Sequence, residues 1–96
     1  MSVVRIVRFK ADPADTEEML VRRAAMVDVV RAKVPGLVEA RLSRLEDGTW
    51  MDQWHYRTPE DAAAAVADAD RHPEVRAAFA LVTDPVGEMA EIVDVR

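Results

Sequence analysis

The segment from Trp50 to Arg57 constrains the fold more than any other part of this 96-residue chain. It contains both tryptophans, the only tyrosine and one of the two histidines. Side chains alternate between the two faces of a β-strand. One face then carries Trp50, Asp52, Trp54 and Tyr56. Because Asp47-Gly48 precedes the segment, and an Asp-Gly step favours a tight turn, the sequence predicts a hairpin whose second strand buries aromatic side chains.

Three further segments are predicted to be strands. Val3 to Lys10 is short and rich in β-branched residues, which favour strands. Leu37 to Leu45 alternates loosely and predicts the first strand of the hairpin. Thr83-Asp84-Pro85 is expected to stop the preceding helix, and Val86 to Val95 is expected to form the last strand.

Two helical regions separate these strands. The first is expected to begin at Asp12-Pro13 or Asp15 and to end at Pro35-Gly36. Its apolar stripe is predicted at Leu20, Ala24, Val27, Val30 and Val34. The second begins at Thr58-Pro59, a threonine cap followed by proline, and restarts after His72-Pro73.

The order strand, helix, strand, strand, helix, strand predicts a ferredoxin-like α+β fold. In this fold one four-stranded antiparallel sheet has its helices on one face, here as a single domain spanning residues 1–96. The helices cover only that face. The first strand is apolar on both faces, with Val4 and Ile6 on one and Val7 and Phe9 on the other. A second copy of the chain is therefore expected to cover the free face, which predicts a homodimer.

Composition excludes several classes of function. The net charge of −5 and the pI of about 4.9 argue against nucleic acid as a partner, since phosphate binding needs clustered Lys and Arg. The chain has no cysteine, its two histidines do not form a recognisable metal site, and it has no phosphate loop or dinucleotide fingerprint. No signal peptide or membrane span is recognisable, so the protein is expected to be cytoplasmic.

Four segments together resemble the dimeric α+β barrel superfamily, and within it the antibiotic-biosynthesis-monooxygenase-type domains. They are Val4 to Lys10, Val34-Pro35-Gly36, Asp47 to Asp52 and Tyr56 to Ala62. The resemblance implies two sheets that meet in a dimer, with a pocket between sheet and helices in each subunit. Some related domains are cofactor-independent oxygenases of electron-rich phenols, others degrade haem, and others cyclise polyketides.

The chain departs from these relatives at several positions. It contains no asparagine, whereas oxygenases and haem-degrading relatives commonly use one in the pocket. It is also similar to stress-responsive barrel proteins, but their His-Pro-x-His pattern reads His72-Pro73-Glu74-Val75 here. The histidine expected on the first strand is Arg5. A cyclase mechanism built on the second histidine therefore does not transfer to this chain.

The resemblance places the aromatic face of the Trp50 strand toward the helices, with Arg5 on the neighbouring strand. Arg5 and Asp52 are predicted catalytic residues: Arg5 stabilises a phenolate or enolate, and Asp52 orients Arg5 or accepts a proton. The alternative is a structural ion pair that fixes strand register. His72 is a third catalytic candidate, as a general acid or base at the pocket mouth, or else a helix cap.

Trp50, Trp54 and Tyr56 are the predicted substrate-binding residues, which would stack on a planar ligand or simply fill the core. His55 lies on the opposite strand face and is expected at the dimer interface. The sequence thus predicts a small cofactor-independent, metal-free enzyme, a monooxygenase-like protein acting on a planar phenolic or polyketide-type molecule. The alternatives are a non-catalytic dimeric ligand-binding or stress-responsive module, and a polyketide cyclase.

Overall fold

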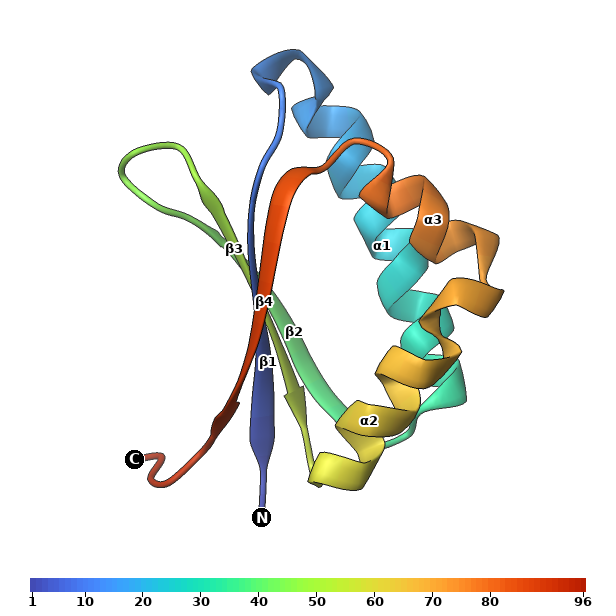
Figure 1. Ribbon diagram of the computed structural model, residues 1–96, viewed down its shortest axis with the longest axis vertical. Coiled ribbons are helices and arrows are strands. Elements are labelled where there is room, and N and C mark those ends of the chain that lie inside the picture. The colour runs from blue at the N-terminus through green and yellow to red at the C-terminus, as the bar shows by residue number, and fades with distance from the viewer.

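The computed structural model describes all 96 residues as one four-stranded antiparallel sheet with the helices on one side (Figure 1). The strands are β1 (Val3–Lys10), β2 (Leu37–Arg44), β3 (Trp50–Tyr56) and β4 (Thr83–Glu91). The helices are α1 (Thr16–Lys33), α2 (Pro59–Asp68) and α3 (Pro73–Phe79), with 3-10 turns η1 (Pro13–Asp15) and η2 (Ala69–Arg71). This order confirms the ferredoxin-like α+β prediction.

The strand order is β2-β3-β1-β4, so β1 lies between β3 and β4. On one side of β1, Arg5 lies opposite Trp54 and Val7 lies opposite Asp52. On the other side, Val7 lies opposite Gly87. Alternate residues of β1 and β3 that face the helices thus form one continuous surface with the helix-facing residues of β4.

Local sequence signals explain where the helices begin. Thr58 Oγ1 accepts a hydrogen bond of 3.1 Å from the Asp61 backbone N–H, and Pro59 follows it, so α2 starts at the predicted cap. Asp12 caps η1 by accepting 2.9 Å from the Ala14 N–H. The His72-Pro73 break separates η2 from α3, as proline lacks an N–H and disfavours continuation of a helix.

The core fills the space between the sheet and the helices. Trp50, Asp52, Trp54 and Tyr56 are all buried, while the residues between them are half-buried, which confirms the predicted alternation on β3. The larger apolar cluster joins Trp54 and Tyr56 to the helices, and a smaller one joins Phe9, Trp50 and Met19. Burial of such side chains is the main favourable term in folding.

Two predictions of detail are only partly right. The predicted stripe of α1 is confirmed at Val27 and Val30, which are buried and half-buried, but Leu20 and Ala24 are exposed. Met19 and Met26 are buried instead. The helix is therefore rotated relative to the expected stripe.

The last strand also begins earlier and ends earlier than predicted. Thr83 pairs with Lys10 across a register shift in β1, and its hydroxyl donates 3.1 Å to the Lys10 carbonyl. Asp84 has φ of 51°, which aspartate tolerates better than most residues. A β-bulge therefore admits Thr83-Asp84-Pro85 to the strand instead of stopping it before Val86.

The other face of the sheet has no helix over it (Figure 1). Val4 and Ile6 of β1 are half-buried on this face. None of the helices is both long and apolar enough to cross a membrane.

Candidate active site

A cavity of about 410 Å³ lies between the sheet and the helices. Most of its lining is apolar and comes from β1, α1, β3, α2 and α3. Four polar side chains enter it from the sheet and α1, namely Arg5, Arg23, Asp52 and Tyr56. A volume of this size is typical of small-molecule sites, as is an apolar wall with a few polar groups.

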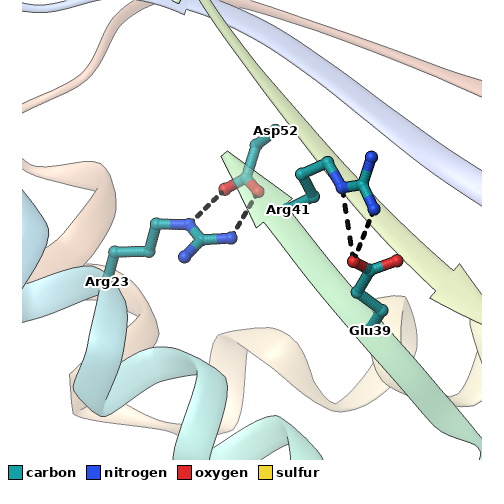
Figure 2. Close-up of polar contacts among 4 residues, drawn as sticks. All are labelled: Arg23, Glu39, Arg41 and Asp52. Atoms are coloured by element: carbon teal, nitrogen blue, oxygen red, sulfur yellow. Dashed lines mark hydrogen bonds and ion pairs between the residues drawn. The ribbon is translucent and has the colours of Figure 1, made fainter. Parts of the chain in front are cut away.

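Asp52 and Arg23 form the central polar contact of the cavity (Figure 2). Arg23 Nε donates to Asp52 Oδ2 at 3.0 Å and Arg23 Nη2 donates to Oδ1 at 2.9 Å. The two side chains are 16% and 6% exposed. Both carboxylate oxygens are thus engaged by one guanidinium, the bidentate geometry that gives the strongest Arg–carboxylate contacts.

Trp54 also contacts Arg23. The Arg23 Cζ lies 5.8 Å from the centre of the Trp54 ring, within the range of a cation–π interaction. Two residues of β3 therefore fix one guanidinium of α1 in position. This contact leaves Asp52 and Trp54 on the cavity wall, as predicted, but gives Asp52 a different partner.

Arg5 lines the same cavity without an ion pair. The prediction that Asp52 orients Arg5 is wrong, because no hydrogen bond or ion pair joins the two side chains and the Asp52 carboxylate binds Arg23 instead. The register explains why: Arg5 is opposite Trp54, one diagonal step from Asp52, and its guanidinium lies over Gly87 on the other neighbouring strand. The structure therefore keeps Arg5 and Asp52 on one wall but gives them different contacts.

Tyr56 contributes a neutral hydroxyl to the cavity. Burial raises the pKa of Tyr56 to about 12, with the nearby charges of Arg5 and Asp52 acting in opposite directions. The hydroxyl forms no hydrogen bond within the protein. A protonated phenol without an internal partner is available as a hydrogen-bond donor to a ligand.

Trp50 lies outside the cavity lining, unlike the other two predicted substrate-binding residues. It packs against Phe9 with ring centres 6.4 Å apart and planes inclined by 14°. Arg44 covers it, with Cζ 4.9 Å from the ring centre. Trp50 thus belongs to the smaller apolar cluster near the hairpin, and the structure places it with the packing alternative rather than with the pocket.

His72 is also absent from the lining of the cavity. Its Nε2 lies 2.6 Å from Asp68 Oδ2, a contact that connects the end of α2 to the start of α3. The same hydrogen bond is the main reason that the pKa of Asp68 is lowered. His72 occupies the N-cap position of α3, but its side chain contacts Asp68 and makes no capping hydrogen bond to α3.

His55 lies on the helix-free face of the sheet, as predicted. Its Nε2 is buried and has no hydrogen-bond partner. A second hollow of about 350 Å³ surrounds it, lined by residues of β1, β2, β3 and the C-terminal segment. Buried polar atoms are normally hydrogen-bonded, so this atom is an exception among the buried polar groups of the chain.

The side chains offer little to a metal ion. No group of three His, Cys, Asp or Glu residues is close enough to hold one. What the cavity wall does offer is a free guanidinium, a neutral phenol and an aromatic ring. The guanidinium and the phenol can stabilise negative charge on an oxygen, and the ring can stack on a planar molecule.

Arg23 is the site residue that sequence reasoning missed. Met19, Arg23, Met26 and Val30 repeat at spacings of four and three and all line the cavity. A single cation within such an apolar stripe needs a partner when it is buried, and Asp52 on the facing strand provides one. The position of Arg23 within this apolar stripe is the feature of the sequence that could have identified it as a site residue.

No protein-family model matches the chain, and no curated protein sequence matches it. Solved structures do match. SnoaB, a cofactor-independent oxygenase from Streptomyces nogalater, is 23% identical, with a TM-score of 0.72 over 98% of this chain and 95% of that one. A candidate antibiotic biosynthesis monooxygenase from Caulobacter crescentus is 19% identical, with a TM-score of 0.75 over 97% of this chain and 91% of that one.

A third structure, a candidate antibiotic biosynthesis monooxygenase from Bordetella bronchiseptica, has a TM-score of 0.78. It is 11% identical, over 96% of this chain and 97% of that one. The chain therefore has the fold of the antibiotic-biosynthesis-monooxygenase-like domains, as the resemblance of its sequence predicted.

Proposed function

We propose that the protein is a homodimeric, cofactor-independent monooxygenase-like enzyme that acts on a planar phenolic or polyketide-type molecule. The single observation that carries the proposal is the Arg5 guanidinium, which lines an apolar cavity without an internal anion. The likeness in fold to SnoaB, a cofactor-independent oxygenase, supports the reaction class.

In this proposal Arg5 lowers the free energy of the ionised substrate. A phenol or enol that loses its proton becomes an electron-rich anion, and a nearby fixed positive charge stabilises that anion strongly in an apolar cavity. The anion then gives an electron to dioxygen. Conversion of a ring CH₂ group to C=O by one molecule of O₂ releases one molecule of water, so the atoms balance with dioxygen as the only oxidant.

The other polar residues have supporting roles. The Asp52–Arg23 pair forms a fixed, mutually neutralised part of the wall, so Asp52 acts as a positioning residue. Trp54 is proposed to stack on the ring of the substrate, and Tyr56 to donate a hydrogen bond to it. Trp50 supports the pocket from behind through Phe9, and no role in proton transfer is proposed for His72.

The homodimer is proposed to form through the helix-free face of the sheet. Support comes from the half-buried Val4 and Ile6, and from the buried Nε2 of His55, which has no partner in one chain. Sedimentation equilibrium is expected to give twice the mass of the chain. His55→Glu, which places a carboxylate on that face, is expected to weaken association, whereas a monomeric wild type at all concentrations would contradict the proposal.

Oxygen uptake with a panel of hydroquinones and naphthols tests the reaction. Wild type is expected to consume oxygen with at least one compound, and Arg5→Ala to reduce kcat/KM by about a hundredfold, the usual effect of one charge-stabilising donor. Arg31→Ala is the matched control, since Arg31 is exposed on α1, outside the cavity lining and away from the helix-free face. No uptake with any compound, or equal loss in both variants, would overturn the proposal.

A non-catalytic ligand-binding module is the second candidate. One form of it predicts a cavity filled by the protein's own side chains, and the open volume of about 410 Å³ argues against that form. A module with an open pocket would bind the same planar compounds without consuming oxygen. Calorimetric binding measured beside oxygen uptake separates the two functions.

A further inference from the structure

Among the charged side chains that enter the cavity from the sheet and α1, Arg5 alone has no partner in the protein. Arg23 and Asp52 bind each other. Arg76, at the rim, donates to the Asp70 backbone carbonyl at 2.6 Å. Asp70 also lines the cavity and its negative charge offsets that of Arg76, so the lining keeps a net charge of one positive unit, which Arg5 carries. A partly buried guanidinium without an anion is costly to desolvate, and this cost falls when a ligand supplies the anion.

The guanidinium of Arg5 lies over Gly87 of β4. A Cβ atom placed on Gly87 would be 2.7 Å from Arg5 Nη2 and 3.3 Å from Arg5 Cζ. Gly87 is opposite Val7 on β1, so it lies one diagonal step from Arg5 on the helix-facing side of the sheet. The absent side chain of Gly87 thus creates the space in which the guanidinium rests.

The backbone does not require glycine at this position. The residues with positive φ are Gly48 and Asp84, so Gly87 has a conformation that alanine can adopt. Glycine within a strand weakens the strand, and it often marks a close approach of another group. Here the group that approaches is the Arg5 side chain.

We infer that Gly87 is a positioning residue that holds the Arg5 guanidinium at the β4 side of the cavity, where Arg5 selects planar ligands carrying one negative charge. The inference rests on the cavity being the ligand site of the proposed function. It does not depend on oxygen chemistry.

Binding of 2-naphthoate and of 2-naphthamide, measured by isothermal titration calorimetry, tests the selection. The two probes have nearly the same planar shape, but only the naphthoate is charged. Wild type is expected to bind the naphthoate about tenfold more tightly, as one charge-assisted contact would give. Equal affinities, or no measurable binding of the naphthoate, would overturn the inference.

Gly87→Ala tests the positioning. The added methyl group displaces the guanidinium, so the naphthoate-to-naphthamide affinity ratio is expected to fall by about fivefold, while naphthamide affinity changes by less than about twofold. Val21→Ala is the control, because Val21 is 65% exposed on α1, outside the cavity lining and away from the helix-free face. The ratio is expected to stay at the wild-type value in that variant.

The double variant Arg5→Gln, Gly87→Ala separates positioning from general damage. If Gly87 acts through Arg5, adding Gly87→Ala to Arg5→Gln leaves the affinity ratio unchanged, near one. A further change in the ratio, or an unchanged ratio in Gly87→Ala alone, would show that Gly87 does not position Arg5.

The outcome is independent of the enzyme assay. A protein that shows the Arg5- and Gly87-dependent ratio but consumes no oxygen disproves the monooxygenase proposal and leaves this inference standing. A protein that consumes oxygen but binds both probes equally disproves this inference alone.

Discussion

Two arginine–carboxylate pairs lie on opposite sides of the sheet, and they show how little a distance reveals by itself (Figure 2). Arg23–Asp52 and Arg41–Glu39 each have a shortest N–O distance of 2.9 Å. The first pair is 16% and 6% exposed, whereas the second is 64% and 51% exposed. Water screens the second pair, so its contribution to stability is small, while the first pair is essential once its members are buried.

The largest expected effect comes from breaking the buried pair. Asp52→Ala leaves Arg23 without an anion inside an apolar stripe, so the free energy of unfolding is expected to fall by about 3–5 kcal/mol. Glu18→Ala is the matched control, since its 2.9 Å pair with Arg22 lies on α1 with side chains 33% and 56% exposed, and the expected loss is below about 1 kcal/mol. Urea unfolding at one fixed protein concentration measures both, and equal losses would mean that burial does not distinguish the pairs.

Burial on the helix-facing side of the sheet also changes the pKa of the only tyrosine, Tyr56. Tyr56 has a folded pKa of about 12 against an ordinary value of 10.0, so the folded state keeps its proton longer than the unfolded state. Its contribution to stability is therefore constant below pH 10.0 and falls by about 3 kcal/mol as the pH rises toward 12.

Tyrosinate absorbance during an alkaline titration reports this pKa directly, because the chain has a single tyrosine. Arg5→Ala is expected to raise the pKa further, since the charge of Arg5 lowers it. A midpoint near the ordinary value in the folded protein would mean that the Tyr56 ring is more exposed to water than its burial implies.

A smaller net effect is expected when both members of the buried pair are replaced together. Arg23→Met with Asp52→Leu removes the charges without leaving either alone, so stability is expected to lie within about 1 kcal/mol of wild type. If the double variant is as unstable as Asp52→Ala, the pair also fixes the relative position of α1 and β3 through its geometry.

The smallest effect is expected at Asp68, whose carboxylate contacts His72 at the junction of α2 and α3. Its pKa is lowered from 3.8, mainly by that hydrogen bond, so the stabilising contribution is present above pH 3.8 and is lost as the pH falls through the lowered value. Asp68→Asn is expected to lower Tm slightly near neutral pH. The difference from wild type should vanish in strong acid, and a difference that persists there would point to packing instead of charge.

Sequence reasoning reached the fold because local signals and periodicity agreed. The Asp47-Gly48 turn, the Thr58-Pro59 helix start and the alternation from Trp50 to Tyr56 all have short-range causes. The strand face of Asp52 and Trp54 was predicted for the same reason. Register was less accessible, since it depends on pairing between distant segments, and register decides that Arg5 lies opposite Trp54 rather than Asp52.

The part of the site that was not predicted from the sequence depends on tertiary contacts. The rotation of α1 that buries Met19 and Met26, and exposes Leu20, follows from packing on the sheet rather than from hydrophobic periodicity alone. Arg23 was therefore unassigned, although it lies within that stripe. The start of β4 was predicted too late, because the bulge near Lys10 depends on pairing with β1. The residues Thr83-Asp84-Pro85 by themselves do not indicate that pairing.

The position of β4 at the edge of the sheet has a consequence for dynamics. It pairs with β1 alone, nearly all of its residues are exposed, and no helix packs over it. Strands held in this way open by local unfolding at a lower free energy than the rest of a domain, and their amide protons exchange sooner. Because β4 carries Gly87, each such opening would release the Arg5 guanidinium, so ligand affinity is thermodynamically coupled to the fraying of one strand.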